Sequence, residues 1–191
     1  MNHKPLFMII FISITIIICI LFMSYKMEET IKIKIETNVG DIIIELYPKS
    51  APITVENFLN YVNDGFYNKT VFHRIIKNFM IQGGGFLENG TEKKTNAPIK
   101  LESNNGLKNE KGTIAMARTI VPDSATSQFF INLQNNEFLN YGYRDEGYAV
   151  FGKVIEGMDI VETIGMADTD EKHDMDDWPS EEIIIKSIIK I

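Results

Sequence analysis

The sequence predicts a mainly-β domain, a closed β-barrel with helices capping its ends. Most apolar segments are short and show the alternation or compact runs that are typical of strands. Only two segments show the three-and-four spacing of an amphipathic helix. The apolar fraction of 45% suits a globular chain, and one cysteine among 191 residues leaves the fold to rest on a hydrophobic core.

Two strands are predicted at the start of this domain. Ile31, Ile33 and Ile35 alternate with charged residues, which is the period-two pattern of a strand with one buried face. Residues 38–41 are typical of a turn, and the mostly apolar residues 42–46 predict the second strand.

A helix is predicted from Pro52 to about Gly65. Proline suits the first turn of a helix, where its missing N–H is not needed, and apolar residues follow it at spacings of three and four. A second, shorter helix is predicted over residues 158–164.

The other strands are predicted over residues 71–76, 79–82, 113–117, 128–133, 148–154 and 182–191. Residues 83–112 are rich in Gly, Asn and Lys, which predicts long loops. Residues 168–177 are predicted to be a solvated acidic loop, since they lack the glycine and the terminal glutamate of an EF-hand calcium loop.

The first 25 residues differ from the rest. Residues 6–23 are apolar except for Ser13 and Thr15, and as a helix they would reach about 27 Å, close to the hydrocarbon thickness of a bilayer. Lys4 precedes this run, so the positive-inside rule predicts a cytoplasmic amino terminus and export of everything after Lys26.

An uncleaved signal anchor is the favoured interpretation of this segment. A cleavable signal peptide stays open, although residues 22–26 lack an Ala-x-Ala pattern, and Cys19 follows an isoleucine where lipid attachment needs a small residue. We therefore expect residues 1–25 to be a signal anchor or signal peptide and residues 26–191 an exported domain. That domain would be periplasmic or otherwise extracytoplasmic, held in the inner membrane by residues 6–23 if uncleaved.

The domain after this segment carries 18 positive and 26 negative side chains, a net charge of −8, and has no cysteine. This acidic balance argues against nucleic acid as a partner. No Gly-x-Ser-x-Gly elbow, P-loop or dinucleotide fingerprint is present. The two histidines of this domain, His73 and His173, have no metal-ligand spacing, so neither a metal nor another cofactor is expected.

Three segments combine polar residues with large or small apolar ones in an unusual way. Residues 71–85 carry one arginine and one glutamine, and strand alternation places Met80 and Gln82 on one face. Ser-Gln-Phe-Phe-Ile at 127–131 is a second such segment. Thr-Ile-Ala-Met-Ala-Arg-Thr at 113–119 is the third, with small residues that leave room for a ligand.

These segments resemble the cyclophilin family of peptidyl-prolyl cis–trans isomerases, most of all its bacterial and exported members. The motifs are Phe-His-Arg-Ile-Ile, Phe-Met-Ile-Gln-Gly-Gly and Ser-Gln-Phe-Phe-Ile, and the likeness runs from about residue 31 to the carboxyl terminus. It implies an eight-stranded antiparallel barrel capped by two helices, and isomerase activity on X-Pro bonds. The partners would be proline-containing peptides and unfolded or folding proteins, and we expect a monomer.

The resemblance also assigns roles residue by residue. Arg74 would be the catalytic arginine, and Gln82 would contact the substrate carbonyl region. The proline ring would lie against Phe79, Met80, Phe130 and Leu139. The groove for the flanking peptide would be lined by Ala117, Arg118, Thr119 and Gln128. Phe138 and Tyr148 would be rim residues, where eukaryotic members often carry tryptophan and histidine, and these departures disfavour tight cyclosporin binding.

Two further expectations concern charge and alternative function. Arg74, Lys77 and Arg118 predict a groove that is locally positive on an acidic domain. A module that binds proline-containing segments without turnover is the alternative to an enzyme. Arg74 favours the enzyme, because binding alone needs no guanidinium at the proline nitrogen.

Overall fold

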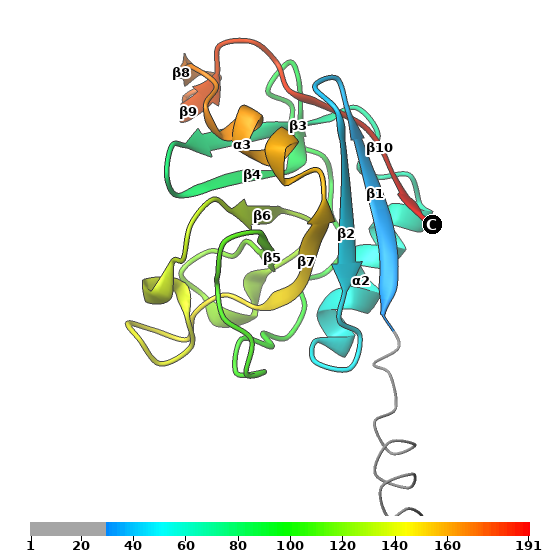
Figure 1. Ribbon diagram of the computed structural model, residues 1–191, viewed down its shortest axis with the longest axis vertical. Helices are drawn as coiled ribbons and strands as arrows, with labels where there is room; N and C mark the ends of the chain where they lie inside the picture. Colours follow the sequence, from blue (N-terminus) through cyan, green and yellow to red (C-terminus); the bar gives the residue numbers. More distant parts are fainter. Residues whose placement is uncertain (1–29) are drawn as a thin grey trace, which may run out of the picture.

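The computed structural model describes residues 30–191 (Figure 1). The predicted signal anchor or signal peptide, with its apolar run at 6–23, lies outside the described residues. Within residues 30–191, the helices are too short or too polar to cross a bilayer.

Eight strands close into an antiparallel barrel in the order β1-β10-β3-β4-β6-β5-β7-β2, as predicted (Figure 1). The strands are β1 (Ile31–Thr37), β2 (Asp41–Leu46), β3 (Thr70–Ile76), β4 (Met80–Leu87), β5 (Thr113–Met116), β6 (Phe129–Asn132), β7 (Val150–Glu156) and β10 (Ile184–Lys190). Closure gives every strand two neighbours, so the sheet has no free edge that could pair with another chain.

The barrel core follows from the alternation seen in the sequence. In β1 and β2, Ile33 lies opposite Ile44 and Ile35 opposite Ile42, and all four side chains are fully buried. Each buried isoleucine contributes about 1.5–3 kcal/mol relative to an exposed one. The hydrophobic stripe therefore sets the register of this pair, since a shift by one residue would turn all four outward.

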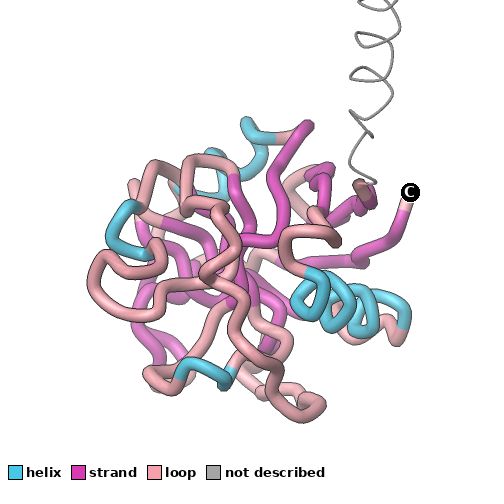
Figure 2. The backbone as a smooth tube through the Cα atoms, turned by 90° about the horizontal axis from the view of Figure 1, so that it is seen from below, coloured by secondary structure: helices cyan, strands magenta, loops and turns pink. Residues whose placement is uncertain are grey.

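Two α-helices cover the core. They are α2 (Pro52–Asn63) and α3 (Met158–Gly165), close to the predicted bounds. Figure 2, the view from below, shows α2 unobstructed at one end of the molecule. The carboxylate of Glu102 caps α2 from a distant loop, because it accepts hydrogen bonds from the backbone N–H groups of Ile53 (3.1 Å) and Thr54 (2.8 Å). An anion at this helix end also complements the helix dipole.

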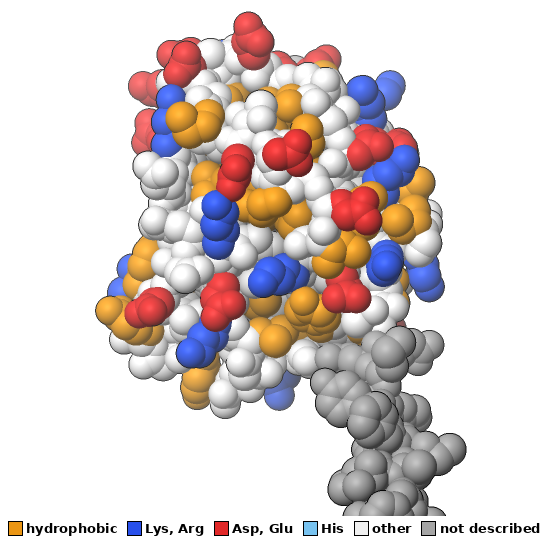
Figure 3. All heavy atoms as spheres, in the orientation of Figure 1, with side chains coloured by type: hydrophobic (Ala, Val, Ile, Leu, Met, Phe, Trp, Pro, Cys, Tyr) orange, Lys and Arg blue, Asp and Glu red, His pale blue; other side chains and the backbone are white. Residues whose placement is uncertain are grey.

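The prediction of a solvated loop at 168–177 was wrong. The structure has a two-stranded hairpin there, β8 (Thr169–Lys172) and β9 (Met175–Pro179). The cause is Trp178, which is fully buried and donates its indole N–H to the carboxylate of Glu182 (3.0 Å). Most of the acidic residues remain exposed, and red side chains gather at the upper left of Figure 3, where the hairpin lies.

Strand β4 is longer than predicted, because the glycines at 83–85 belong to it. Gly83 lies opposite both Phe72 and Phe129, so the strand passes close to two aromatic rings. Gly84 has a φ of +85°, and a Cβ there would lie 2.9 Å from ring carbons of Phe129 and Tyr67. Glycine is required at this position for both reasons.

Candidate active site

The candidate site lies on the outer face of the barrel wall formed by β3, β4, β6 and β5. Alternation along β6 sends Phe129 into the main core, while Phe130 belongs to a second, smaller apolar cluster. Likewise Ile81 packs in the main core, whereas Met80 belongs to the smaller cluster. The wall thus has a barrel side and a site side, as strand geometry requires.

Strand register places three predicted site residues in one row. Arg74 of β3 lies opposite Gln82 of β4, and Gln82 lies opposite Phe130 of β6. Phe130 in turn lies opposite Ala115 of β5. Neighbouring strands are about 4.8 Å apart, so residues distant in the sequence become adjacent here.

An irregularity in β3 frees Arg74 from the core. Strict alternation would put Phe72 and Arg74 on the same face. The register shifts between these two residues, and Phe72 and Ile75 are buried in the core while the Arg74 side chain is 43% exposed. The bulge therefore turns a guanidinium outward from a strand that is otherwise mostly buried.

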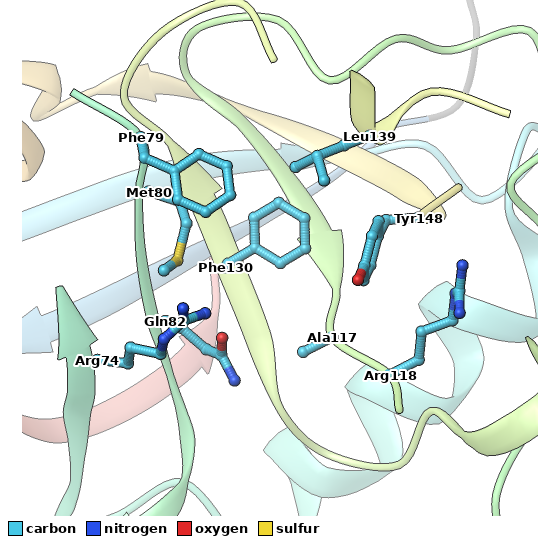
Figure 4. Close-up of a pocket in the computed structure, with 9 residues that line it drawn as sticks. All are labelled: Arg74, Phe79, Met80, Gln82, Ala117, Arg118, Phe130, Leu139 and Tyr148. Atoms are coloured by element: carbon cyan, nitrogen blue, oxygen red, sulfur yellow. The ribbon is translucent and has the colours of Figure 1, made fainter. Parts of the chain in front are cut away.

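Nine of the predicted residues line one open pocket (Figure 4). They are Arg74, Phe79, Met80, Gln82, Ala117, Arg118, Phe130, Leu139 and Tyr148. The volume of about 230 Å³ is below the roughly 300–1,000 Å³ of drug-sized sites, so it suits a single ring. Figure 4 shows Arg74 and Gln82 on one side of the pocket and Arg118 on the other, with Phe130 and Ala117 between them.

The pocket has an apolar floor and aromatic walls. Met80, Phe130 and Leu139 are only 2–5% exposed. Tyr148 packs edge-on against Phe130, with ring centroids 5.6 Å apart. Phe138 does not line the pocket; its ring stacks on Phe79 at 5.5 Å and supports that wall from outside.

The two remaining predicted residues, Thr119 and Gln128, line an adjoining hollow. This hollow shares Gln82, Ala117 and Arg118 with the pocket. At the boundary, the side-chain amide of Gln82 donates a hydrogen bond to Oε1 of the Gln128 side chain (2.9 Å). The residues that complete the hollow and that the sequence analysis missed are Glu92, Ser124 and Thr126. They lie outside the strands, where no periodic pattern marks them.

A buried asparagine network behind the pocket was also missed. Asn136 is fully buried, and its side-chain N–H group donates to the Phe79 carbonyl (2.9 Å) and to the side-chain oxygen of Asn132 (2.7 Å). The Asn109 side chain donates to the Leu139 carbonyl (3.0 Å). These bonds hold the backbone of Phe79 and of Leu139, two residues that line the pocket.

The three cations near the pocket each face an aspartate, which reduces the positive field that the sequence predicted. Nε of Arg74 lies 3.5 Å from Asp177, and Nζ of Lys77 lies 3.2 Å from Asp168. Arg118 has a Nη2–Asp145 distance of 3.0 Å, and its Nε donates to the Gly147 carbonyl (2.8 Å). The Gly147 N–H, together with the two neighbouring arginines, lowers the pKa of the Asp145 carboxyl.

His73, next to Arg74, is a packing residue. Its ring centroid lies 4.7 Å from that of Phe86 and 6.1 Å from that of Trp178. Burial lowers the pKa of the imidazole to about 4, and the nearby charge of Arg74 acts in the same direction. The ring is therefore neutral at pH 7. Across residues 30–191, no three or more His, Cys, Asp or Glu side chains are grouped to hold a metal ion.

Comparisons with known proteins agree with the resemblance that the sequence motifs indicate. The family model described as "Cyclophilin type peptidyl-prolyl cis-trans isomerase/CLD" matches residues 32–190. The chain is 61% identical over 137 residues to "Peptidyl-prolyl cis-trans isomerase" of Acinetobacter baylyi, covering 72% of this chain and 73% of the relative. It is 52% identical over 155 residues to "Peptidyl-prolyl cis-trans isomerase B" of Escherichia coli, covering 80% and 94%.

A solved structure gives the corresponding fold. The crystal structure of a cyclophilin type peptidyl-prolyl cis-trans isomerase from Cryptosporidium parvum matches with a TM-score of 0.74 at 32% identity. The match covers 85% of this chain and 98% of that one.

Proposed function

The chain belongs to the family of cyclophilin-type peptidyl-prolyl cis–trans isomerases, and we propose that it rotates X-Pro bonds by a non-covalent mechanism in which Arg74 stabilises the twisted amide. The carrying observation is the 43% exposed guanidinium of Arg74 at the edge of an apolar pocket sized for a single ring (Figure 4). The other guanidinium at this pocket, that of Arg118, is only 4% exposed and is held by Asp145. The substrates are proline-containing segments of unfolded or folding proteins.

The reaction itself explains why so little chemistry is needed. Amide resonance gives a rotation barrier of about 18–20 kcal/mol, so uncatalysed X-Pro isomerisation takes tens to hundreds of seconds. Reaching milliseconds requires removing about 7 kcal/mol, at about 1.4 kcal/mol per decade. No covalent bond breaks, so the mechanism calls for no nucleophile and no general base.

Arg74 acts on the proline nitrogen. In the twisted state this nitrogen becomes pyramidal and regains its lone pair, which a guanidinium N–H can bind. The planar isomers offer no such acceptor, so the hydrogen bond is made only in the transition state, as catalysis requires. Arginine stays charged and presents several N–H groups on a rigid fork. One charge-assisted hydrogen bond contributes about 1.5–3 kcal/mol, which is part of the barrier reduction and not all of it.

The pocket supplies much of the remainder by holding the ring. Met80, Phe130 and Leu139 form a buried apolar floor against which a pyrrolidine ring packs. With the ring fixed, the acyl side of the bond is the part that turns, and Gln82 stands beside Arg74 to meet the substrate carbonyl. Restricting the reacting group in this way lowers the barrier through orientation.

The test is an isomerisation assay on an X-Pro peptide with wild type, Arg74→Ala and Arg74→Lys. Loss of one transition-state hydrogen bond predicts a fall in kcat/KM of about 10- to 100-fold for Arg74→Ala, with Arg74→Lys between it and wild type. Lys186→Ala removes an exposed cation on β10 and serves as the control, with an unchanged rate expected. Equal rates for wild type and Arg74→Ala would contradict the mechanism.

The proposal extends to where the enzyme works. Support for an extracytoplasmic location comes from the apolar run at 6–23 and the preceding Lys4. In that setting the clients are exported proteins that fold outside the cytoplasm.

A further inference from the structure

We propose that Asp177, on the β8–β9 hairpin, is a positioning residue that orients the guanidinium of Arg74 for the reaction. The inference rests on the catalytic role proposed above for Arg74. Its starting point is the distance of 3.5 Å between Nε of Arg74 and Oδ2 of Asp177. Asp177 does not line the pocket, so its effect on the substrate passes through the arginine.

A bulge in β9 aims Asp177. Asp170 pairs with Trp178 and Lys172 pairs with Met175, so β9 has one residue more than β8 between these two pairs. Asp177 lies in this interval and has a φ of +61°, in the left-handed region that aspartate tolerates better than most residues. Bulges beside active sites commonly redirect a side chain in this manner.

Buried contacts fix the hairpin against β3 independently of the ion pair. Trp178, the neighbour of Asp177 in the chain, packs against His73, the neighbour of Arg74. Both of these rings are buried, whereas Asp177 and Arg74 are 36% and 43% exposed. The packing of these rings therefore holds Asp177 close to Arg74. The ion pair itself contributes little to folding stability.

Pairing at Nε has a defined consequence for catalysis. A half-exposed arginine samples many rotamers, and a carboxylate at Nε restricts them. The two terminal amino groups of the fork stay available for the proline nitrogen. Figure 4 shows the Arg74 guanidinium reaching over Gln82 at the pocket margin. The negative charge of Asp177 also weakens the positive field of Arg74. If the orienting effect is the larger of the two, kcat falls when this charge is removed.

The experiment compares Asp177→Asn, which keeps the shape and removes the charge, with Asp176→Asn, which removes the adjacent exposed charge. We expect kcat for an X-Pro peptide to fall about three- to ten-fold in Asp177→Asn, with KM and melting temperature unchanged. Asp176→Asn should match wild type. Asp177→Gly, which relieves the positive φ, is a second variant should the asparagine disturb folding.

A double-mutant cycle with Arg74→Ala separates positioning from a structural role. If Asp177 acts through Arg74, adding Asp177→Asn to Arg74→Ala causes no further loss. An equal loss in both backgrounds, or a rate in Asp177→Asn at or above wild type while Arg74→Ala is slow, overturns the positioning role alone. A wild-type rate in Arg74→Ala overturns both proposals.

Discussion

The stability of this fold depends on pH through one buried imidazole, that of His73. His73 packs between Phe86 and Trp178 and is only 4% exposed. Its pKa of about 4 in the folded chain lies below the ordinary value of 6.5, because burial disfavours the charged ring. The unfolded chain therefore binds the proton more readily. Stability contributed by the neutral ring is full above about pH 6.5 and is lost as the pH falls toward 4.

His73→Phe keeps an aromatic ring and removes the titration. From about pH 7 to pH 4.5 we expect wild type to lose about 2 kcal/mol more of its free energy of unfolding than the variant does. Urea unfolding at both pH values measures the difference. Equal losses in the two proteins would show that the buried imidazole does not govern acid stability.

The turn at Asn78 shows how far the local structure around one residue can be predicted from the sequence. Lys77-Asn78 directly precedes the pocket residue Phe79. Asn78 has a φ of +58°, a conformation that asparagine adopts more readily than most side chains, and Phe79 N–H bonds to the Ile76 carbonyl (3.0 Å). The sequence motifs predicted Phe79 as a site residue but not this turn, which the structure shows to be closed by a hydrogen bond.

At the scale of elements, the asparagine network connects β6 with the turn before β4 and the segment after Asn136. Asn132 and Asn136 are fully buried, and their amides bond to each other and to the backbone of Phe79. A fully satisfied buried network of this kind makes the surrounding structure rigid. The pocket walls therefore depend on polar contacts that lie behind them.

Asn136→Ala should weaken both the fold and substrate binding. It leaves the Phe79 carbonyl and the Asn132 oxygen without this donor, at a cost of about 1–3 kcal/mol in the free energy of unfolding. KM should rise because the Phe79 wall moves, while kcat changes less. Chemical denaturation and steady-state kinetics measure the two effects. The exposed neighbour Asn135, bonded only to the Lys111 N–H in the structure, is the matched control, and an equal response of Asn135→Ala would contradict this role.

Elements with strong local patterns were predictable from the sequence, and those shaped by distant contacts were not. The alternating isoleucines of β1 and the proline-led helix α2 depend on their own residues, and both lie close to their predicted bounds. The β8–β9 hairpin depends on Trp178 packing against β3, which no local pattern reveals. The bulges in β3 and β9 are likewise set by strand pairing between distant segments.

On the scale of the whole molecule, the closed barrel brings the site together. The motifs, through their family resemblance, predicted every residue that lines the pocket, and the row Arg74–Gln82–Phe130 emerges only when three strands pair. The bonds from the asparagine network to Phe79 and Asn109 and the ion pair of Asp177 were missed, because each joins segments that are far apart in the sequence.

The extracytoplasmic location that we propose predicts a defined product in cells. If residues 6–23 form an uncleaved signal anchor, the full-length chain should fractionate with membranes, and its domain should be accessible to protease from the outside only. Mass spectrometry of the purified protein gives the amino terminus. A product that begins near residue 25 would contradict the anchor, and a chain found in the cytosol would contradict export.

The division of apolar residues into two clusters has a consequence for how this enzyme can be altered. The pocket floor of Met80, Phe130 and Leu139 belongs to one cluster, and the isoleucines of the barrel belong to the other. Substitutions at distant sites that share no packing partners have nearly additive effects on the free energy of unfolding. Peptide preference can therefore be redesigned by libraries at the pocket, with the barrel kept as an unchanged scaffold and stability screened as an independent property.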